Sequence, residues 1–136
     1  MNGIGETPCH RMPVRVYYED TDLAGIVYYA NYLRFIERAR SEWVRGLGVD
    51  QVALKADEGV VFAVRRIEAE YLAPARFDDE VEVVTQVEAV TGARLVLNQD
   101  VMRAGQVLFS SIVTLVAVNE QGAPVRLPAN FRRNLH

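Results

Sequence analysis

Cysteine and histidine are scarce in this sequence. Its 136 residues include one cysteine, Cys9, and two histidines, His10 and His136. A single cysteine allows no internal disulfide, and a cytoplasmic location is the simplest expectation for such a chain. These three side chains also lack the spacing of metal ligands, so we expect no metal site. Because no histidine lies in the predicted core, a Ser-His-Asp hydrolase is disfavoured as well.

Excess charge and long apolar runs are also missing. The formal net charge is -3 and the isoelectric point is about 5.4, whereas a nucleic-acid-binding domain normally carries a basic face. We therefore expect no nucleic-acid partner. No apolar run approaches the length of a membrane span, and residues 1–12 contain no signal-peptide core. The length suits one domain, which we expect over residues 13–136 after a flexible N-terminal segment, residues 1–12.

The first half of the chain predicts a strand followed by helices. Apolar residues alternate with polar ones between Pro13 and Glu19, which is typical of a short strand. From Tyr29 the apolar residues recur at helical spacing, with no glycine or proline before Gly46, which predicts a long helix. Asp50 is positioned to cap a short second helix over residues 51–57.

The second half of the chain predicts strands. Alternating runs occupy residues 66–71, 80–88, 94–101 and 107–117, and glycine-containing links, typical of tight hairpins, join the last three. One strand, a central helix and four further strands predict an α+β fold, with the helix on one face of an antiparallel sheet of about five strands. Such a sheet has open edges, so we expect a homodimer or a tetramer.

The clearest functional signal lies between Arg15 and Arg45. An acidic turn, Asp20-Thr-Asp22, is followed by Gly25 and then by the predicted helix. A carboxylate therefore precedes a helix start, where free backbone N–H groups and the helix dipole create positive potential. This pairing suits attack on a carbonyl group, because the acid can supply or activate the nucleophile while N–H groups hold the oxyanion.

The same stretch resembles a known family. Asp22-Leu-Ala-Gly25-Ile-Val-Tyr-Tyr29-Ala-Asn-Tyr32, continued by Phe35-Ile-Glu-Arg-Ala-Arg40, is similar to the signature of the hotdog-fold acyl-CoA thioesterases. The likeness is to the 4-hydroxybenzoyl-CoA thioesterase branch, which includes the Tol-Pal-associated acyl-CoA thioesterases, and it covers about residues 13–120. It implies a β-α-β-β-β-β hotdog fold, active sites at a subunit boundary, and hydrolysis of acyl-CoA to a free acid and CoA. CoA then enters as part of the substrate, and no cofactor is expected.

The resemblance assigns two catalytic positions. Asp22 corresponds to the family's catalytic carboxylate, as nucleophile or as general base, and the sequence leaves these two roles open. Tyr29 is expected to act through its backbone N–H, which would polarise the thioester carbonyl. The alternative for Asp22 is a purely structural role in a turn or a helix cap, which aspartate often has. For the ring of Tyr29 the alternative is packing along the pocket wall.

The remaining candidates are expected to contact the substrate. Gly25 would let the loop approach it closely, Asn31 would shape the helix entry, and Tyr32 is expected mainly in the core. Basic side chains, with backbone donors at the Thr91-Gly92 turn, would bind the CoA phosphates, although ordinary exposed strand charges are the alternative. The substrate-binding candidates are Gly25, Val27, Tyr28, Asn31, Tyr32, Arg65, Thr91, Gly92 and Arg94, with Arg66 and Arg103 as further choices for the phosphates.

Other functions stay open at this point. Another arm of the hotdog superfamily places its carboxylate on the central helix, where Glu37 would be the candidate. A hotdog hydratase or dehydratase is a second possibility, although such enzymes use a histidine. A non-catalytic acyl-CoA-binding or scaffold protein is a third. The acyl group (short, long or aromatic) is undetermined, and an acyl carrier protein or a cell-envelope complex is a possible partner.

Overall fold

Five strands form one antiparallel sheet in the computed structural model, which describes residues 9–134. The order across the sheet is β1-β3-β4-β5-β2, so β1 and β2 are its edges. The strands are β1 Cys9–Arg15, β2 Val61–Tyr71, β3 Glu80–Val90, β4 Arg94–Arg103 and β5 Gln106–Val118. The helices are α1 Asn31–Gly46, α2 Gln51–Glu58 and α3 Ala129–Asn134.

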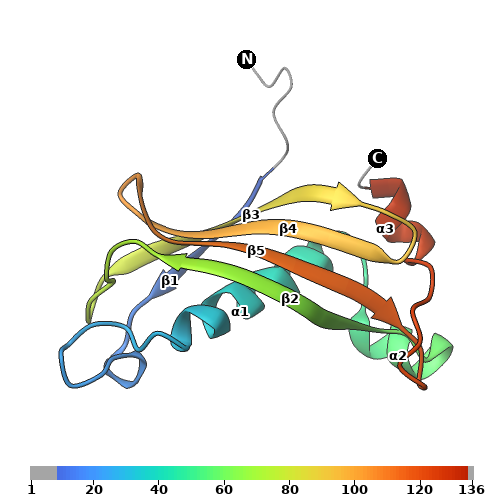
Figure 1. Ribbon diagram of the computed structural model, residues 1–136, viewed down its shortest axis with the longest axis horizontal. Helices are drawn as coiled ribbons and strands as arrows, with labels where there is room; N and C mark the ends of the chain where they lie inside the picture. The colour runs from blue at the N-terminus through green and yellow to red at the C-terminus, as the bar shows by residue number, and fades with distance from the viewer. Residues whose placement is uncertain (1–8, 135–136) are drawn as a thin grey trace, which may run out of the picture.

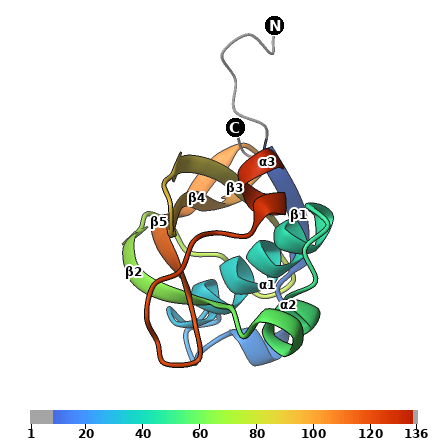
Figure 2. The ribbon, with the colours of Figure 1, turned by 90° about the vertical axis from the view of Figure 1, so that its right-hand side faces the viewer.

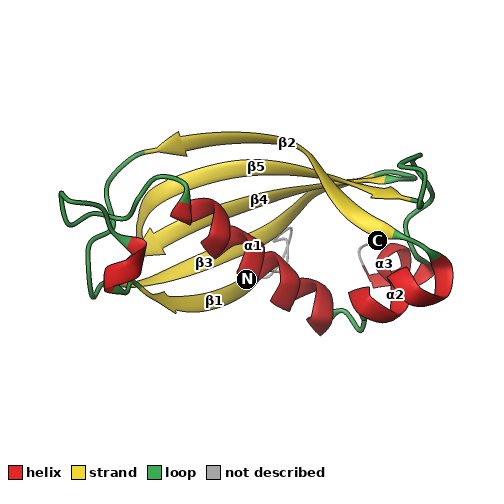
Figure 3. Cartoon of the chain, turned by 90° about the horizontal axis from the view of Figure 1, so that it is seen from below, coloured by secondary structure: helices red, strands yellow, loops and turns green. Residues whose placement is uncertain are grey.

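The long helix α1 lies against the concave face of the sheet, as Figures 1 and 3 show. In the end-on view of Figure 2 the sheet curves around this helix. Its apolar stripe is buried as the helical spacing predicts at Phe35, Ile36, Ala39, Trp43 and Val44, whereas Leu33, near the start of the helix, is exposed. The predicted α+β hotdog arrangement, one strand and a central helix followed by four strands, is therefore confirmed.

The first strand lies earlier in the chain than its alternation predicts. Instead of spanning Pro13 to Glu19, β1 runs from Cys9 to Arg15, so residues 9–12 of the segment expected to be flexible belong to the sheet. The ladder with β3 ends where Arg15 pairs with Glu80, the first residue of β3. Beyond that point the chain enters a 3-10 turn at Tyr18–Asp20, because the Asp20 carboxylate accepts a hydrogen bond from the Tyr17 amide. Residues 1–8 lie outside the described part of the chain.

The helix boundaries are close to those predicted, with one addition. α1 begins at Asn31 rather than Tyr29, because residues 28–30 form a turn in which the Asn31 amide donates to the Tyr28 carbonyl. Asp50 caps α2 as expected, accepting hydrogen bonds from the amides of residues 52 and 53. The C-terminal helix α3 has no strong signal in the sequence, and its buried Phe131 packs against Trp43. Across residues 9–134 no helix combines the length and apolar character that a membrane crossing needs.

Candidate functional site

Asp22 lies in a tight loop between β1 and α1. Its amide donates to the Ile26 carbonyl at 2.9 Å, and its own carbonyl accepts from the Gly25 amide at 3.0 Å. Gly25 has a φ of +76°, a left-handed conformation that glycine adopts without steric cost. One carboxylate oxygen of Asp22, Oδ1, accepts from the Ala24 amide at 2.8 Å. Asp22 thus has the turn-forming role that aspartate often has, and within residues 9–134 its second oxygen has no hydrogen-bond donor.

An open cavity of about 550 Å³ lies beside this carboxylate. Asp22 is exposed and lines the cavity together with Thr21 and Gly25 and with three apolar or aromatic side chains. Of these, Leu23 is fully exposed at the loop tip, and the rings of Tyr18 and Phe77 meet edge to face. A carboxylate beside exposed apolar walls is suited to a ligand that places an apolar group against the walls and a polar atom next to the carboxylate.

The turn before α1 presents a free backbone amide. The Tyr28 amide donates to the Asp20 carbonyl at 2.9 Å, and the Asn31 amide donates to the Tyr28 carbonyl at 2.8 Å. The Tyr29 amide donates to no residue that the structure describes. Tyr29 lies two residues before the first residue of α1, so its N–H belongs to the turn at the positive end of the helix dipole rather than to the helix itself.

Asp20 ties this turn to the Asp22 loop. Its buried carboxylate accepts from the Tyr17 amide through Oδ2 and from the Asn31 side chain through Oδ1, each at 2.9 Å. Asp20 thereby orders the turn and Asn31 holds the entry of α1, while the expected contact of Asn31 with the substrate stays a prediction. Asp22 and the Tyr29 amide consequently flank one short, fixed segment of the chain.

An aromatic cluster lies beneath the helix entry. The ring of Tyr32 is buried and stacks on Phe109, with ring centroids 5.0 Å apart, so the expectation that Tyr32 packs in the core is confirmed. The Tyr32 hydroxyl accepts a hydrogen bond from the Ala75 amide at 3.0 Å, and burial raises its pKa. Tyr71, the last residue of β2, contacts both rings and donates from its hydroxyl to the Tyr29 carbonyl at 3.0 Å.

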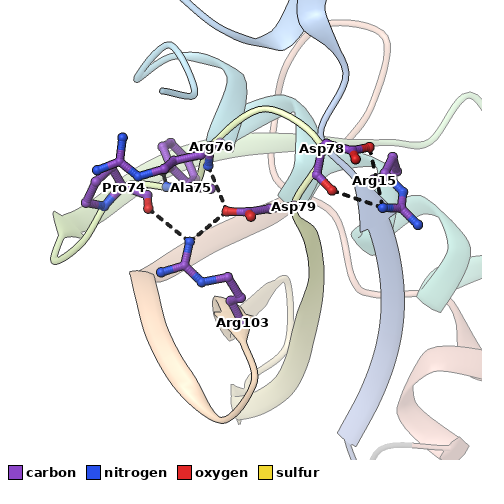
Figure 4. Close-up of polar contacts among 8 residues, drawn as sticks. Arg15, Pro74, Ala75, Arg76, Asp78, Asp79 and Arg103 are labelled. Carbon is purple, nitrogen blue, oxygen red and sulfur yellow. Dashed lines mark hydrogen bonds and ion pairs between the residues drawn. The ribbon is translucent and has the colours of Figure 1, made fainter. Parts of the chain in front are cut away.

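The loop between β2 and β3, residues 72–79, supports the Asp22 loop, and the sequence did not indicate this role. The Val27 amide donates to the Ala75 carbonyl at 2.8 Å, which joins the two loops. The supporting loop is itself anchored by Asp79, whose carboxylate accepts from the Arg76 amide at 2.9 Å and from Arg103 Nη1 at 2.6 Å (Figure 4). Only pairing in three dimensions brings Arg103 to this loop, so no sequence pattern identifies it as part of the support.

The predicted site residues fall into two groups in one protomer. The first group, Gly25, Val27, Tyr28, Asn31 and Tyr32, lies with Asp22 and Tyr29 on one continuous segment. The second group is remote from this segment: the β3–β4 turn with Thr91, Gly92 and Arg94 is at the opposite end of the sheet (Figure 1), and Arg65 is exposed beside the bulge in β2.

The second group offers fewer phosphate donors than expected. The Thr91 amide donates to the Arg94 carbonyl at 2.9 Å and closes the hairpin, so it is not free for a phosphate. Arg94 itself is exposed. Of the further choices, Arg103 is engaged by Asp79 and Arg66 pairs with Glu68 on the exposed face of β2.

Glu37, the alternative carboxylate, lies elsewhere on the protein. It is exposed on α1 and lines a separate small cavity of about 130 Å³ with Arg40 and apolar side chains of β2 and β5. Burial lowers the pKa of Arg40, and the negative charge of Glu37 opposes that shift. Glu37 therefore lines a cavity that contains neither Asp22 nor any residue of its loop.

The chain is similar to known thioesterases in sequence and in fold. The acyl-CoA thioester hydrolase YbgC of Escherichia coli O6:H1 is 46% identical over 133 residues, covering 93% of this chain and 98% of that protein. The acyl-CoA thioesterase YbgC of Haemophilus influenzae is 38% identical, covering 91% of this chain and 92% of that protein. The crystal structure of a probable thioesterase from Bartonella henselae superimposes with a TM-score of 0.84 at 35% identity, over 89% of this chain and 100% of that one.

Two further findings concern the fold and the family. A mutant of 4-hydroxybenzoyl CoA thioesterase, solved with bound 4-hydroxybenzoyl CoA, has a TM-score of 0.88 at 21% identity, over 94% of this chain and 99% of that one, and at this identity it supports the hotdog fold alone. The model of the Thioesterase superfamily matches residues 24–110, more than half of the sequence. With this match, and with relatives that align along almost their whole length, the chain belongs to the thioesterase superfamily.

Proposed function

We propose that this protein hydrolyses acyl-CoA thioesters to a free carboxylic acid and CoA, with Asp22 as its catalytic carboxylate. The observation that carries the proposal is the position of Asp22, exposed in a cavity with apolar walls on the segment that leads into α1. The acyl-CoA substrate is supported by the names of the relatives from Escherichia coli and Haemophilus influenzae.

Asp22 has two chemically consistent routes. As a nucleophile, a carboxylate oxygen attacks the acyl carbon, CoA leaves as the thiolate, and water then hydrolyses the mixed anhydride. As a general base, Asp22 takes a proton from a water molecule whose oxygen attacks the same carbon, and the proton is later available to the thiolate. Both routes need one carboxylate oxygen that accepts no hydrogen bond. Among the described residues none donates to the second carboxylate oxygen of Asp22.

The developing oxyanion would be held by the Tyr29 amide. This N–H is unpaired within residues 9–134 and belongs to the turn at the N-terminal end of α1. A donor directed at the oxyanion acts mainly in the transition state, and losing one typically costs roughly 3–4 kcal/mol of activation free energy. The proposed chemistry requires only the protein, water and the substrate, so CoA is part of the substrate rather than a cofactor.

Replacing the acid tests the assignment. We expect Asp22→Asn to lower kcat at least about 100-fold, because an amide neither attacks the thioester nor accepts a proton from water. The measurement is thiol release from a panel of short, long and aromatic acyl-CoA substrates. Asp57→Asn, which changes an exposed aspartate of α2, is the matched control and should keep the wild-type rate.

Other outcomes would point to other functions. Undiminished hydrolysis by Asp22→Asn would refute the role of Asp22, and Glu37→Gln would then be the next variant to measure. CoA binding without thiol release from any substrate would indicate a binding or scaffold protein. Hydration of an enoyl-CoA without thiol release would indicate a hydratase.

We further propose that the working form is a homodimer or a tetramer built through β2. This strand is an edge of the sheet and is exposed along almost its whole length. Its residues Ile67, Ala69 and Tyr71 are paired with Val113, Ser111 and Phe109 of β5, all of which are buried. Directly paired residues share one face of a sheet. These three side chains of β2 therefore lie on the core-facing side of the sheet, yet no other element of the described chain buries them. A second copy would cover it and place each active site at a subunit boundary.

The cellular setting is also part of the proposal. Acyl-CoA hydrolysis in the cytoplasm agrees with a sequence that contains one cysteine and thus no internal disulfide. An acyl carrier protein is a natural alternative thioester substrate, and it can be added to the substrate panel. Association with a cell-envelope complex can be tested by co-purification with the tagged protein.

A further inference from the structure

A side chain of the sheet donates a hydrogen bond to the turn that contains the Tyr29 amide. Tyr71, at the end of β2, donates from its hydroxyl to the Tyr29 carbonyl at 3.0 Å. The two residues are 42 positions apart in the sequence, so this bond joins the edge strand directly to the entry of α1. Within residues 9–134 it is the one side-chain hydrogen bond to the backbone of residues 28–30.

The hydrogen bonds around this turn leave two backbone N–H groups without an acceptor among the described residues. The Tyr28 amide is held by Asp20, the Tyr28 carbonyl by the Asn31 amide, and the Tyr29 carbonyl by the Tyr71 hydroxyl. The amides of Tyr29 and Ala30 donate to no described residue. A carbonyl that accepts a hydrogen bond polarises its peptide unit and strengthens the N–H of that unit as a donor. The hydrogen bond on the Tyr28 carbonyl therefore orients and polarises the peptide that carries the Tyr29 N–H. The hydrogen bond on the Tyr29 carbonyl does the same for the peptide that carries the Ala30 N–H.

We propose that Tyr71 is a positioning residue for catalysis: its hydroxyl orients the 29–30 peptide, so that the N–H of this peptide, which belongs to Ala30, points together with the Tyr29 N–H toward the thioester oxygen in the transition state. This inference rests on the proposed function, because it assumes that the turn holds the oxyanion. Tyr71 acts through the turn and is not assigned a direct contact with the reacting atoms.

The surroundings of Tyr71 suit such a role. Its ring meets Tyr29, Tyr32 and Phe109 at centroid distances of 6.3, 5.5 and 5.1 Å, all edge to face, so three neighbours fix its direction. Burial raises the pKa of the Tyr71 hydroxyl, and the neighbouring Tyr29 and Tyr32 raise it further. The group consequently stays protonated at neutral pH, and it must donate here because its partner is a carbonyl oxygen.

Removing one oxygen atom tests the proposal. Tyr71→Phe keeps the ring contacts and deletes the hydrogen bond to Tyr29. We expect kcat to fall about five- to tenfold, as for the loss of one neutral hydrogen bond, with KM within about twofold of wild type, because the effect arises in the transition state. A kcat within about twofold of wild type, or a rise in KM with kcat unchanged, would overturn the proposal.

Two controls separate positioning from packing. Tyr17→Phe deletes the hydroxyl of an exposed tyrosine outside the cluster and should keep the wild-type kcat. Phe131→Leu disturbs a separate buried aromatic cluster, formed with Trp43 and Phe62, so it should lower Tm while kcat stays within about twofold. If Phe131→Leu lowers kcat as much as Tyr71→Phe, general packing explains the effect and the proposal fails.

A spectroscopic measurement reports on the carbonyl itself. With an acyl-CoA bound to the Asp22→Asn protein, the thioester C=O stretching frequency should rise when Tyr71→Phe is added, because a misdirected donor polarises the carbonyl less. An unchanged frequency would count against the proposal. Failure of the proposed function is read separately: a fully active Asp22→Asn protein refutes the catalytic acid, whereas an inactive Asp22→Asn protein beside a fully active Tyr71→Phe protein refutes Tyr71 alone.

Discussion

Asp20 and Asp22 are two carboxylates of one turn that lie in different environments. Asp20 is buried and both of its oxygens accept hydrogen bonds, from the Tyr17 amide and the Asn31 side chain. Asp22 is exposed, and one of its oxygens accepts a bond from the Ala24 amide. A fully bonded, buried carboxylate is suited to holding a structure, whereas an exposed one with a free oxygen is suited to chemistry. The environment of each residue thus supports the separate roles.

Asp79 is a residue whose charge should matter for stability. Burial alone would raise its pKa, but hydrogen bonds from the Arg76 amide and the Arg103 guanidinium, with the attraction of both arginines, lower it below the ordinary value. A lowered pKa in the folded state means that the stabilisation is present above about pH 4 and is lost as pH falls through the folded-state pKa. We expect Asp79→Asn to reduce the free energy of unfolding by about 1 kcal/mol at pH 7, a modest value because solvent reaches the pair.

The pH profile of urea unfolding checks this expectation. The difference between wild type and Asp79→Asn should shrink as pH falls below about 4, because the wild-type carboxyl then becomes neutral. Asp78→Asn is the neighbouring control: its carboxylate is exposed and lies 3.6 Å from the exposed Arg15, so its effect should stay below about 0.5 kcal/mol. An equal loss in both variants, or a difference independent of pH, would contradict the role of the Asp79–Arg103 pair.

At the scale of elements, α1 is fixed to the sheet by a buried polar contact as well as by its apolar stripe. Gln99 of β4 is fully buried, and its Nε2 donates to the Ile36 carbonyl at 3.0 Å and to Thr85 Oγ1 at 2.9 Å. Its Oε1 accepts from Arg40 Nη1 at 2.9 Å. Gln99 therefore links two strands to the middle of α1, and its polar atoms are satisfied there.

We expect Gln99→Leu to destabilise the protein by roughly 2–4 kcal/mol, because the Thr85 hydroxyl and the half-buried Arg40 lose their partner in a low-dielectric interior. Chemical denaturation measures the change. The double variant Gln99→Leu with Thr85→Val should recover part of the loss, since the hydroxyl that needed a partner is then absent. Full stability of Gln99→Leu alone would show that the contact does not fix the helix.

At the scale of the whole molecule, β2 is an edge strand whose core-facing side chains stay exposed in a single protomer. The strand carries the alternating pattern of a half-buried strand, yet Ile67 and Tyr71 are 38% and 49% exposed. Its outer edge offers unpaired backbone groups, and an uncovered edge of this length favours pairing with another copy. The proposed oligomer would supply the cover that this pattern predicts.

A charge on the core-facing side of β2 tests the oligomer. We expect Ile67→Lys to convert the dimer into a monomer at micromolar concentration, because the ammonium group would have to be desolvated at the interface. Light scattering after size exclusion measures the mass, and hydrolysis should fall in parallel if the site lies at the boundary. Glu68→Gln, on the opposite face of the same strand, should keep the wild-type mass. A monomeric wild-type protein would refute the proposal.

Much of the fold follows from residue periodicity because each element buries one face. The helical spacing of α1 and the alternation in β3, β4 and β5 predict elements close to those observed, whereas β2 begins at Val61, five residues before its predicted start. Features that depend on distant partners were not predicted correctly. β1 ends at Arg15 because β3 begins at its partner Glu80, and α3 forms where Phe131 meets Trp43. Neither partner is adjacent in the sequence.

The candidate site divides in the same way. The segment from Asp22 to Tyr32 is continuous, so its residues are necessarily neighbours, and the motif alone indicates the acid that we propose and the turn beside it. The support from Ala75, Arg103 and Tyr71 comes from other strands and loops, and only the folded sheet brings these groups to the turn. The sequence by itself therefore determined which residues form the Asp22 loop and the turn before α1, because backbone preferences act over a few residues. Tertiary structure decided which of them are buried, bonded or free, because those properties depend on contacts between segments far apart in the chain.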